Sequence, residues 1–118
     1  MMYKIHPVEE QIIAKSICPE LSDGELLFVV NEEGKFTGKS VCEIIDDSIY
    51  IKKLNAPYDD ARTLMFLNML NYAERRKIKK AVCLNNELID LCKRYGFDEN
   101  MTVSLEGFFA PGAHCNHE

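Results

Sequence analysis

The sequence contains no long apolar run and no excess of basic residues. No stretch of 18 or more apolar residues is present among its 118 residues, so no transmembrane helix is expected. The first residues, MMYKIHPVEEQ, lack the apolar core of a signal peptide, and we therefore expect a cytoplasmic protein that does not bind membranes. The formal net charge of -5 disfavours a nucleic-acid partner held by phosphate contacts. Backbone N–H groups could still bind an anionic cofactor.

Paired cysteines and centrally placed histidines are also missing. The five cysteines are widely spaced and form no CxxC pair, which predicts free and mostly buried thiols. Two of the three histidines, His114 and His117, flank Cys115 in the tail, and these three residues could ligate zinc. A loose polar tail is the simpler interpretation, so we expect no metal site. The histidine positions give no support for a Ser-His-Asp or Cys-His catalytic group.

The length and the 47% hydrophobic content are typical of one globular domain. We interpret residues 1–118 as a single domain, in which residues 1–24 form a short helical segment, residues 25–109 the core, and residues 110–118 a flexible tail. Within the first segment, residues 7–17 read as a helix with Pro7 at its first position and Glu9 and Glu10 at the positive end of the helix dipole.

The core residues change from a strand pattern to a helix pattern after residue 58. Segments 25–31, 36–45 and 48–54 are rich in strand formers, and turns at 32–35 and 46–47 join them into an antiparallel meander. Segments 59–76 and 85–95 have helical periodicity, and the apolar strand 78–84 lies between them. One or two short strands follow in 101–109. A strand, a helix and a strand in succession predict a parallel pair with a right-handed crossover.

The predicted helix 59–76 has an apolar face, and Asp59 or Asp60 is expected to cap its start. That face contains Leu64, Phe66, Leu67, Met69, Leu70 and Ala73, and we expect Met65 and Met69 to be core residues. Together the elements predict an α/β (α+β) fold, in which a meander and a βαβ unit share a mixed central sheet with helices on both faces.

This order of elements resembles the GNAT superfamily of acyl-CoA N-acyltransferases over residues 25–109. The similarity is greatest in LNMLNYAERRKIKKAVCLNNELIDLCKRYGF, where a helix, a strand, an Asn and a second helix ending in Gly-Phe follow one another. Asn85, Leu88, Leu91, Gly96 and Phe97 match the second part of that pattern. The resemblance implies acetyl-CoA or coenzyme A as co-substrate and direct attack of an amine on the thioester.

The resemblance also implies which residues bind the co-substrate. The thioester carbonyl would hydrogen-bond backbone N–H groups near Lys53, Leu54 and Asn55, and Asn85 would lie beside the same cleft. The pyrophosphate would meet the loop 57–62, which includes Asp60, Ala61 and Arg62.

That loop departs from the family's pattern, because Asp60 and Arg62 occupy its two glycine positions. Carboxylates there would repel a pyrophosphate, and Arg62 could offset part of that repulsion. The alternative interpretation makes Asp59 and Asp60 ordinary first-turn residues and Arg62 a solvated side chain.

Two further residues are candidate catalytic groups. Cys92 stands where many GNAT enzymes have a Tyr that protonates the leaving thiolate, although a cysteine on the inner face of a helix is more often a core residue. Glu43 could be a general base in a cleft or an outward charge.

The leading functional prediction is transfer of an acetyl group from acetyl-CoA to an amine on a small molecule or peptide. The rival prediction is a catalytically inactive GNAT-fold binding or interaction protein, which the altered loop and the missing Tyr favour. The family usually has a strand and two helices before the meander, and this chain has fewer residues there. A homodimer that completes the acceptor site is therefore also predicted.

Overall fold

A computed structural model describes residues 3–109 of the chain. Its core is a six-stranded mixed sheet whose strands lie in the order in which they occur in the sequence. The strands are β1 (Lys4–Val8), β2 (Glu25–Glu32), β3 (Lys35–Ile45), β4 (Ser48–Asn55), β5 (Lys80–Cys83) and β6 (Thr102–Ser104). The helices are α1 (Gln11–Ile17), α2 (Asp59–Arg75) and α3 (Ile89–Arg94), and the 3-10 turn η1 (Asn86–Leu88) precedes α3.

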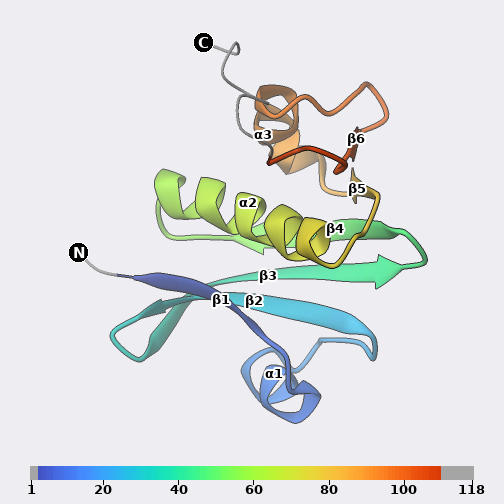
Figure 1. The fold of residues 1–118 in the computed structure, drawn as a ribbon. Coiled ribbons are helices and arrows are strands. Elements are labelled where there is room, and N and C mark those ends of the chain that lie inside the picture. The colour runs from blue at the N-terminus through green and yellow to red at the C-terminus, as the bar shows by residue number, and fades with distance from the viewer. Residues whose placement is uncertain (1–2, 110–118) are drawn as a thin grey trace.

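The sheet combines the predicted meander with the predicted parallel pair. Strands β1 to β4 are antiparallel, β5 is parallel to β4, and β6 is antiparallel to β5. Figure 1 shows α2 on one face of the sheet and α1 on the other. The predicted fold class, a mixed sheet with helices on both faces, is therefore confirmed.

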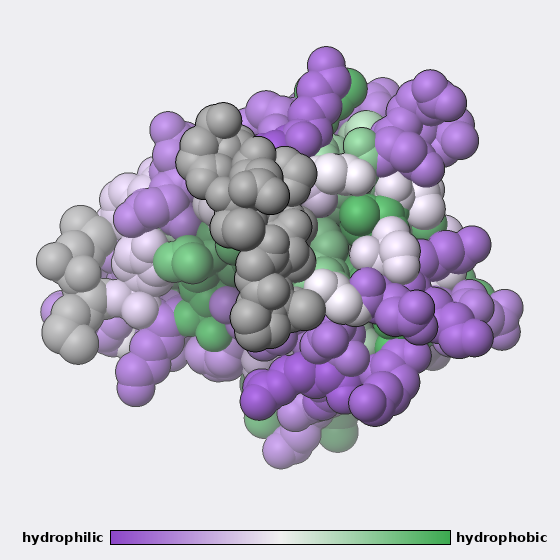
Figure 2. Space-filling model, turned by 45° about the horizontal axis from the view of Figure 1, so that its top comes forward, coloured by the Kyte–Doolittle hydropathy of each residue, from purple (hydrophilic) through white to green (hydrophobic). Residues whose placement is uncertain are grey.

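Each face of the sheet has its own apolar core. The larger core lies under α2 and α3 and includes Phe28, Ile49, Met65 and Leu91, all at most 1% exposed. The smaller core lies under α1 and is centred on Ala14. Figure 2 shows hydrophilic residues surrounding smaller areas of apolar residues on one face of the molecule. Within residues 3–109, no helix has both the length and the apolar character needed to span a membrane.

The predicted N-terminal helix over residues 7–17 begins too early. Pro7 and Val8 belong to β1, where they pair with Phe28 and Leu27 of β2, and the helix starts only at Gln11. Proline lacks the N–H that a central strand needs, but it is tolerated on an edge strand such as β1. Pairing with an available edge of the meander thus overrides the local preference of Pro7 for the first turn of a helix.

Helix α2 differs from the prediction in its cap and in its apolar face. Tyr58 is the N-cap residue, so neither Asp59 nor Asp60 is the cap, and both aspartates lie in the first helical turn. Leu64 is 44% exposed, because the face that packs on the sheet is centred on Met65 and Met69, both fully buried. The expectation that these two methionines are core residues is confirmed.

The two predicted turns have the required backbone conformations. Glu33 and Gly34 both have positive φ, at 52° and 89°, as a tight turn between two antiparallel strands requires. Asp46 also has a positive φ, 56°, in the turn between β3 and β4. The predicted helix 85–95 is shorter in the structure, since its first part is η1, and the segment 101–109 contributes one short strand, β6.

Candidate acyl-transfer site

The two parallel strands at the centre of the sheet separate before β4 ends. Residues Ser48–Ile51 of β4 pair with β5, and the N–H of Leu84 donates to the carbonyl of Ile51 at 2.8 Å. Beyond that bond, β4 continues to Asn55 while the chain after Leu84 turns into η1. The end of β4, residues 52–55, therefore has no strand partner on its β5 side among the described residues.

A bulge in β4 lies at the point of separation. The pairing between β3 and β4 steps from Val41 opposite Lys53 to Cys42 opposite Ile51, so that Lys52 is an extra residue. Because of this extra residue, Leu54 packs with the same core as Ile51. A bulge beside a gap between strands redirects backbone groups and side chains, which is a common arrangement near binding sites.

The bulge residue Lys52 joins two carboxylates on the α1 face of the sheet. Its Nζ lies 2.6 Å from Glu43 Oε1 and 2.8 Å from Glu25 Oε2. The hydrogen bonds to Glu25 and Glu43 raise the pKa of Lys52, and the hydrogen bond from Lys52 lowers the pKa of Glu25. Glu43 is thus one member of a charged cluster beside the strand gap, with its side chain 24% exposed. Sequence reasoning missed Lys52 and Glu25. The available signal was that the three adjacent strands β2, β3 and β4 each carry a charged residue.

The chain after the gap is fixed by Asn85. Its side-chain oxygen accepts the N–H of Glu87 at 2.9 Å and so caps η1. Asn85 thus caps the helical segment that follows β5, one residue beyond Leu84, which is bonded to Ile51 of β4.

Cys92 lies in the large core, where it is 1% exposed, and forms a hydrogen bond with Cys83. The thiol of Cys92 donates to the sulfur of Cys83, so the protonation of one thiol depends on that of the other. This hydrogen bond lowers the pKa of Cys83 to about 7 and raises the pKa of Cys92. Cys92 therefore holds its proton more firmly than an ordinary thiol, and it packs as a small core residue does.

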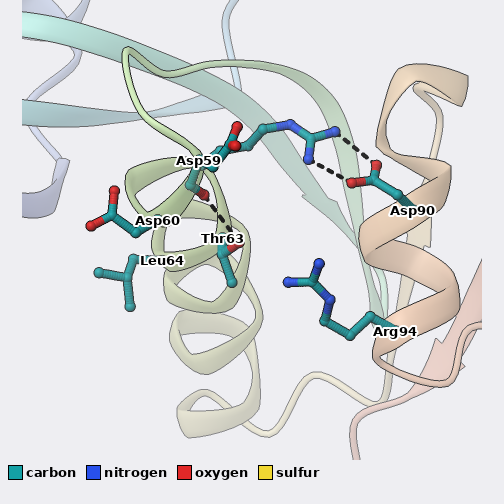
Figure 3. Close-up of a pocket in the computed structure, with 7 residues that line it drawn as sticks. Asp59, Asp60, Thr63, Leu64, Asp90 and Arg94 are labelled. Atoms are coloured by element: carbon teal, nitrogen blue, oxygen red, sulfur yellow. Dashed lines mark hydrogen bonds and ion pairs between the residues drawn. The ribbon is translucent and has the colours of Figure 1, made fainter.

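An open pocket of about 560 Å³ lies between the first turn of α2 and helix α3. The pocket is lined by Asp59, Asp60, Arg62, Thr63, Leu64, Asp90 and Arg94. Figure 3 shows Arg94 extending from α3 toward α2, and Thr63 bonded to the carbonyl of Asp59. Within residues 3–109, Arg94 forms no ion pair.

Arg62 bridges the two helices across this pocket. Its guanidinium donates two bonds of 2.8 and 2.9 Å to the carboxylate of Asp90 and one of 2.8 Å to the carbonyl of Glu87. The bond from Arg62 lowers the pKa of Asp90 to about 2. Sequence reasoning did not place Asp90 or Arg94 at a site, and both residues are exposed. No spacing in the sequence signals the contact, because Arg62 and Asp90 are 28 positions apart and lie on different helices.

The fold is that of the GNAT acyl-CoA N-acyltransferases. The chain is similar to the ribosomal-protein-S18-alanine N-acetyltransferase of Escherichia coli, with 14% identity and a TM-score of 0.64 over 82% of this chain and 78% of that one. It is also similar to a GNAT family acetyltransferase from Elizabethkingia anophelis with acetyl-CoA bound, with 17% identity and a TM-score of 0.64 over 81% and 76% of the two chains. A Bacillus subtilis acetyltransferase in complex with CoA has 11% identity and a TM-score of 0.59 over 79% and 74%. No family model and no curated protein sequence matches the chain.

The end of β4 and the first turn of α2 are the two places where the resemblance puts an acyl-CoA, and they differ in charge. The gap beside residues 53–55 offers a strand edge to the amide-containing arm that ends in the thioester. The first turn of α2 offers a phosphate no glycine, and it carries the carboxylates of Asp59 and Asp60 instead. Arg62, the cation nearest in sequence, is already bonded to Asp90. Close approach of a pyrophosphate is therefore disfavoured by both shape and charge.

Proposed function

We propose that this chain is a GNAT-type N-acyltransferase, which moves a short acyl group, acetyl in the first instance, from a thioester of the coenzyme A type to a primary amine. The observation that carries the proposal is the gap between β4 and β5, with the bulge at Lys52 beside it. The same fold occurs in acetyltransferases that contain acetyl-CoA or CoA. The thioester supplies an activated acyl carbon.

In this proposal the end of β4 orients the thioester. A backbone N–H group within Lys53–Asn55 that points away from β3 would donate to its carbonyl oxygen, where negative charge develops during attack. Asn85, at the start of η1, would hold the far side of the arm. Neither task needs a side-chain acid in the core, so Cys92 has no assigned step.

Glu43 would take the proton that the amine loses. The amine nitrogen forms a bond to the acyl carbon as the carbon–sulfur bond breaks, and the one proton that the nitrogen loses passes to Glu43. The sulfur leaves as a thiolate and takes a proton from water, while Glu43 returns its proton to water. The bond to Lys52 holds Glu43 in place on the α1 face of the sheet. An amine on that face would approach the acyl carbon from the side opposite α2. The acceptor would be a small molecule or a peptide with a free amine.

The test is a comparison of Glu43→Gln with Glu25→Gln. Both substitutions remove one carboxylate partner of Lys52, but only Glu43 is on β3, the strand next to β4. With a panel of amines and thiol release as the signal, Glu43→Gln is expected to lower kcat by about 10²-fold or more. Glu25→Gln is expected to stay within a few-fold of the unchanged protein. Equal losses in the two variants would remove Glu43 from the proposed role.

The second candidate function is an interaction module without catalysis. The observation that favours it is the Arg62–Asp90 contact, which ties α2 to α3 beside a carboxylate-bearing first turn. Absence of thiol release with every donor and amine, together with absence of binding of any thioester at millimolar concentration, would favour this candidate.

A further inference from the structure

The charges around the pocket between α2 and α3 do not balance. Arg62 and Asp90 neutralise one another through two hydrogen bonds. The remaining charged side chains that line the pocket are Asp59, Asp60 and Arg94, which leaves two carboxylates and one guanidinium. Figure 3 shows Asp60 on the side of α2 that is turned away from α3. Figure 3 shows both aspartates on the N-terminal turn of α2. The resemblance puts a pyrophosphate at this turn, with glycine at the positions of Asp60 and Arg62.

Two N–H groups at the start of α2 donate hydrogen bonds within the chain. The N–H of Ala61 donates to Asp60 Oδ1 at 2.9 Å, and the N–H of Arg62 donates to the carbonyl of Tyr58 at 2.9 Å. Asp60 further accepts a hydrogen bond from Tyr3, and burial together with that bond raises the pKa of Tyr3. A carboxylate thus occupies the place that an incoming phosphate would need, and a second carboxylate, Asp59, precedes it.

The strand gap has the opposite character. Residues 53–55 at the end of β4 are Lys53, Leu54 and Asn55, and none of them carries a negative charge. An uncharged arm of amide and thioester groups meets no repulsion there, whereas the three phosphates of a complete coenzyme A would extend toward the acidic turn of α2.

We infer that the acyl donor of this protein is a small pantetheine-type thioester that lacks the adenosine diphosphate half of coenzyme A. The inference rests on the proposed function and narrows its donor. The donor is recognised through the strand edge of β4, and Asp59 and Asp60 select against ligands that carry phosphates beyond the pantetheine arm. The acyl transfer itself is unchanged: the carbon–nitrogen bond forms, the carbon–sulfur bond breaks, and the free thiol is released.

The inference is tested by titrating the full chain with coenzyme A and with pantetheine, following backbone amide signals by NMR at low and moderate salt. Pantetheine is expected to bind at least about tenfold more tightly than coenzyme A at low salt. Added salt is expected to narrow the difference, because it screens exposed charges. Rates of thiol release from acetyl-pantetheine and acetyl-CoA are expected to follow the same order.

A pair of variants isolates the two carboxylates. Asp59→Asn with Asp60→Asn removes two charges and keeps an oxygen that can accept the N–H of Ala61. It is expected to tighten coenzyme A binding by about tenfold or more and to change pantetheine binding by less than twofold. The matched control, Glu99→Gln with Glu106→Gln, removes two exposed charges that do not line the pocket and is expected to change neither affinity.

The possible outcomes separate the inference from the proposed function. Tighter binding of coenzyme A than of pantetheine by the unchanged protein overturns the inference and leaves the proposed function standing. An unaltered coenzyme A affinity in the Asp59→Asn, Asp60→Asn variant also overturns it. Absence of binding by both ligands up to millimolar concentration overturns the inference and the proposed function together.

Discussion

Replacement of Asp90 by Asn should destabilise the protein at neutral pH and have little effect in acid. The carboxylate of Asp90 receives two bonds from the guanidinium of Arg62, and this contact lowers its pKa from 3.8 to about 2. A carboxylate whose pKa is depressed by folding contributes stability above its unfolded pKa. That contribution is lost as the pH falls through the folded pKa. The relevant window is therefore about pH 4 down to pH 2.

The size of the effect is limited by exposure. The side chain of Asp90 is 56% exposed and that of Arg62 is 26% exposed, so solvent screens much of the attraction that the pKa shift reflects. Because two hydrogen bonds join the pair, its contribution to the free energy of unfolding should lie at the upper end of the range for exposed ion pairs, at about 1 kcal/mol. For a domain of this length, that corresponds to a loss of about 4 °C in Tm at pH 7.

Urea unfolding followed by circular dichroism at pH 7, 4 and 3 measures the difference between the unchanged protein and Asp90→Asn. The matched control is Asp23→Asn, which removes a 92% exposed carboxylate from its ion pair with Lys15 and should leave the free energy of unfolding essentially unchanged. The cost of Asp90→Asn should shrink as the pH falls below 4. A cost that is the same at pH 7 and pH 3, or no cost at pH 7, would refute the reasoning.

Three other predictions concern packing and catalysis. Gly38→Ala should lower the free energy of unfolding, measured with urea, by about 1–3 kcal/mol. The new Cβ would lie 2.8 Å from the carbonyl oxygen of Asn55 and 2.9 Å from Val30 Cγ2. An unchanged free energy of unfolding would show that β4 can move away. Met65→Ala, at a fully buried position, should cost about 2–5 kcal/mol by the same assay, and a cost below 1 kcal/mol would contradict the packing described. Cys92→Ala should leave kcat/KM for acyl transfer within about threefold, whereas a hundredfold loss would assign the thiol a catalytic step.

The sheet was largely predictable because its signals are local. Turn residues at Gly34 and Asp46 separate segments that are rich in strand-forming residues, and the change to helical periodicity after residue 58 marks the crossover. The parallel pairing of β4 and β5 follows from that crossover. Strand β1 was missed because its only local signal, Pro7, is equally suited to a helix start, and its strand state depends on pairing with β2, about 20 residues away.

The candidate site was predictable only in part. The resemblance alone gave the end of β4 and Asn85 as site residues, and their role in binding the acyl donor stays a prediction. The contact between Arg62 and Asp90 joins residues 28 positions apart, and no sequence spacing specifies it. The bulge at Lys52 depends on the register of β3 against β4, which is set by packing on both faces of the sheet. A homodimer that completes the acceptor wall stays a prediction.

The measurement that tests the central claim most directly is an NMR titration of the protein with a non-hydrolysable acetyl-pantetheine analogue. If the strand gap holds the acyl donor, the largest amide shifts should fall on Lys53, Leu54 and Asn55, with a second group at Leu84 and Asn85. Saturable shifts confined to other parts of the sheet, or no shifts at millimolar ligand, would contradict the assignment of an acyl-transfer site to the gap between β4 and β5.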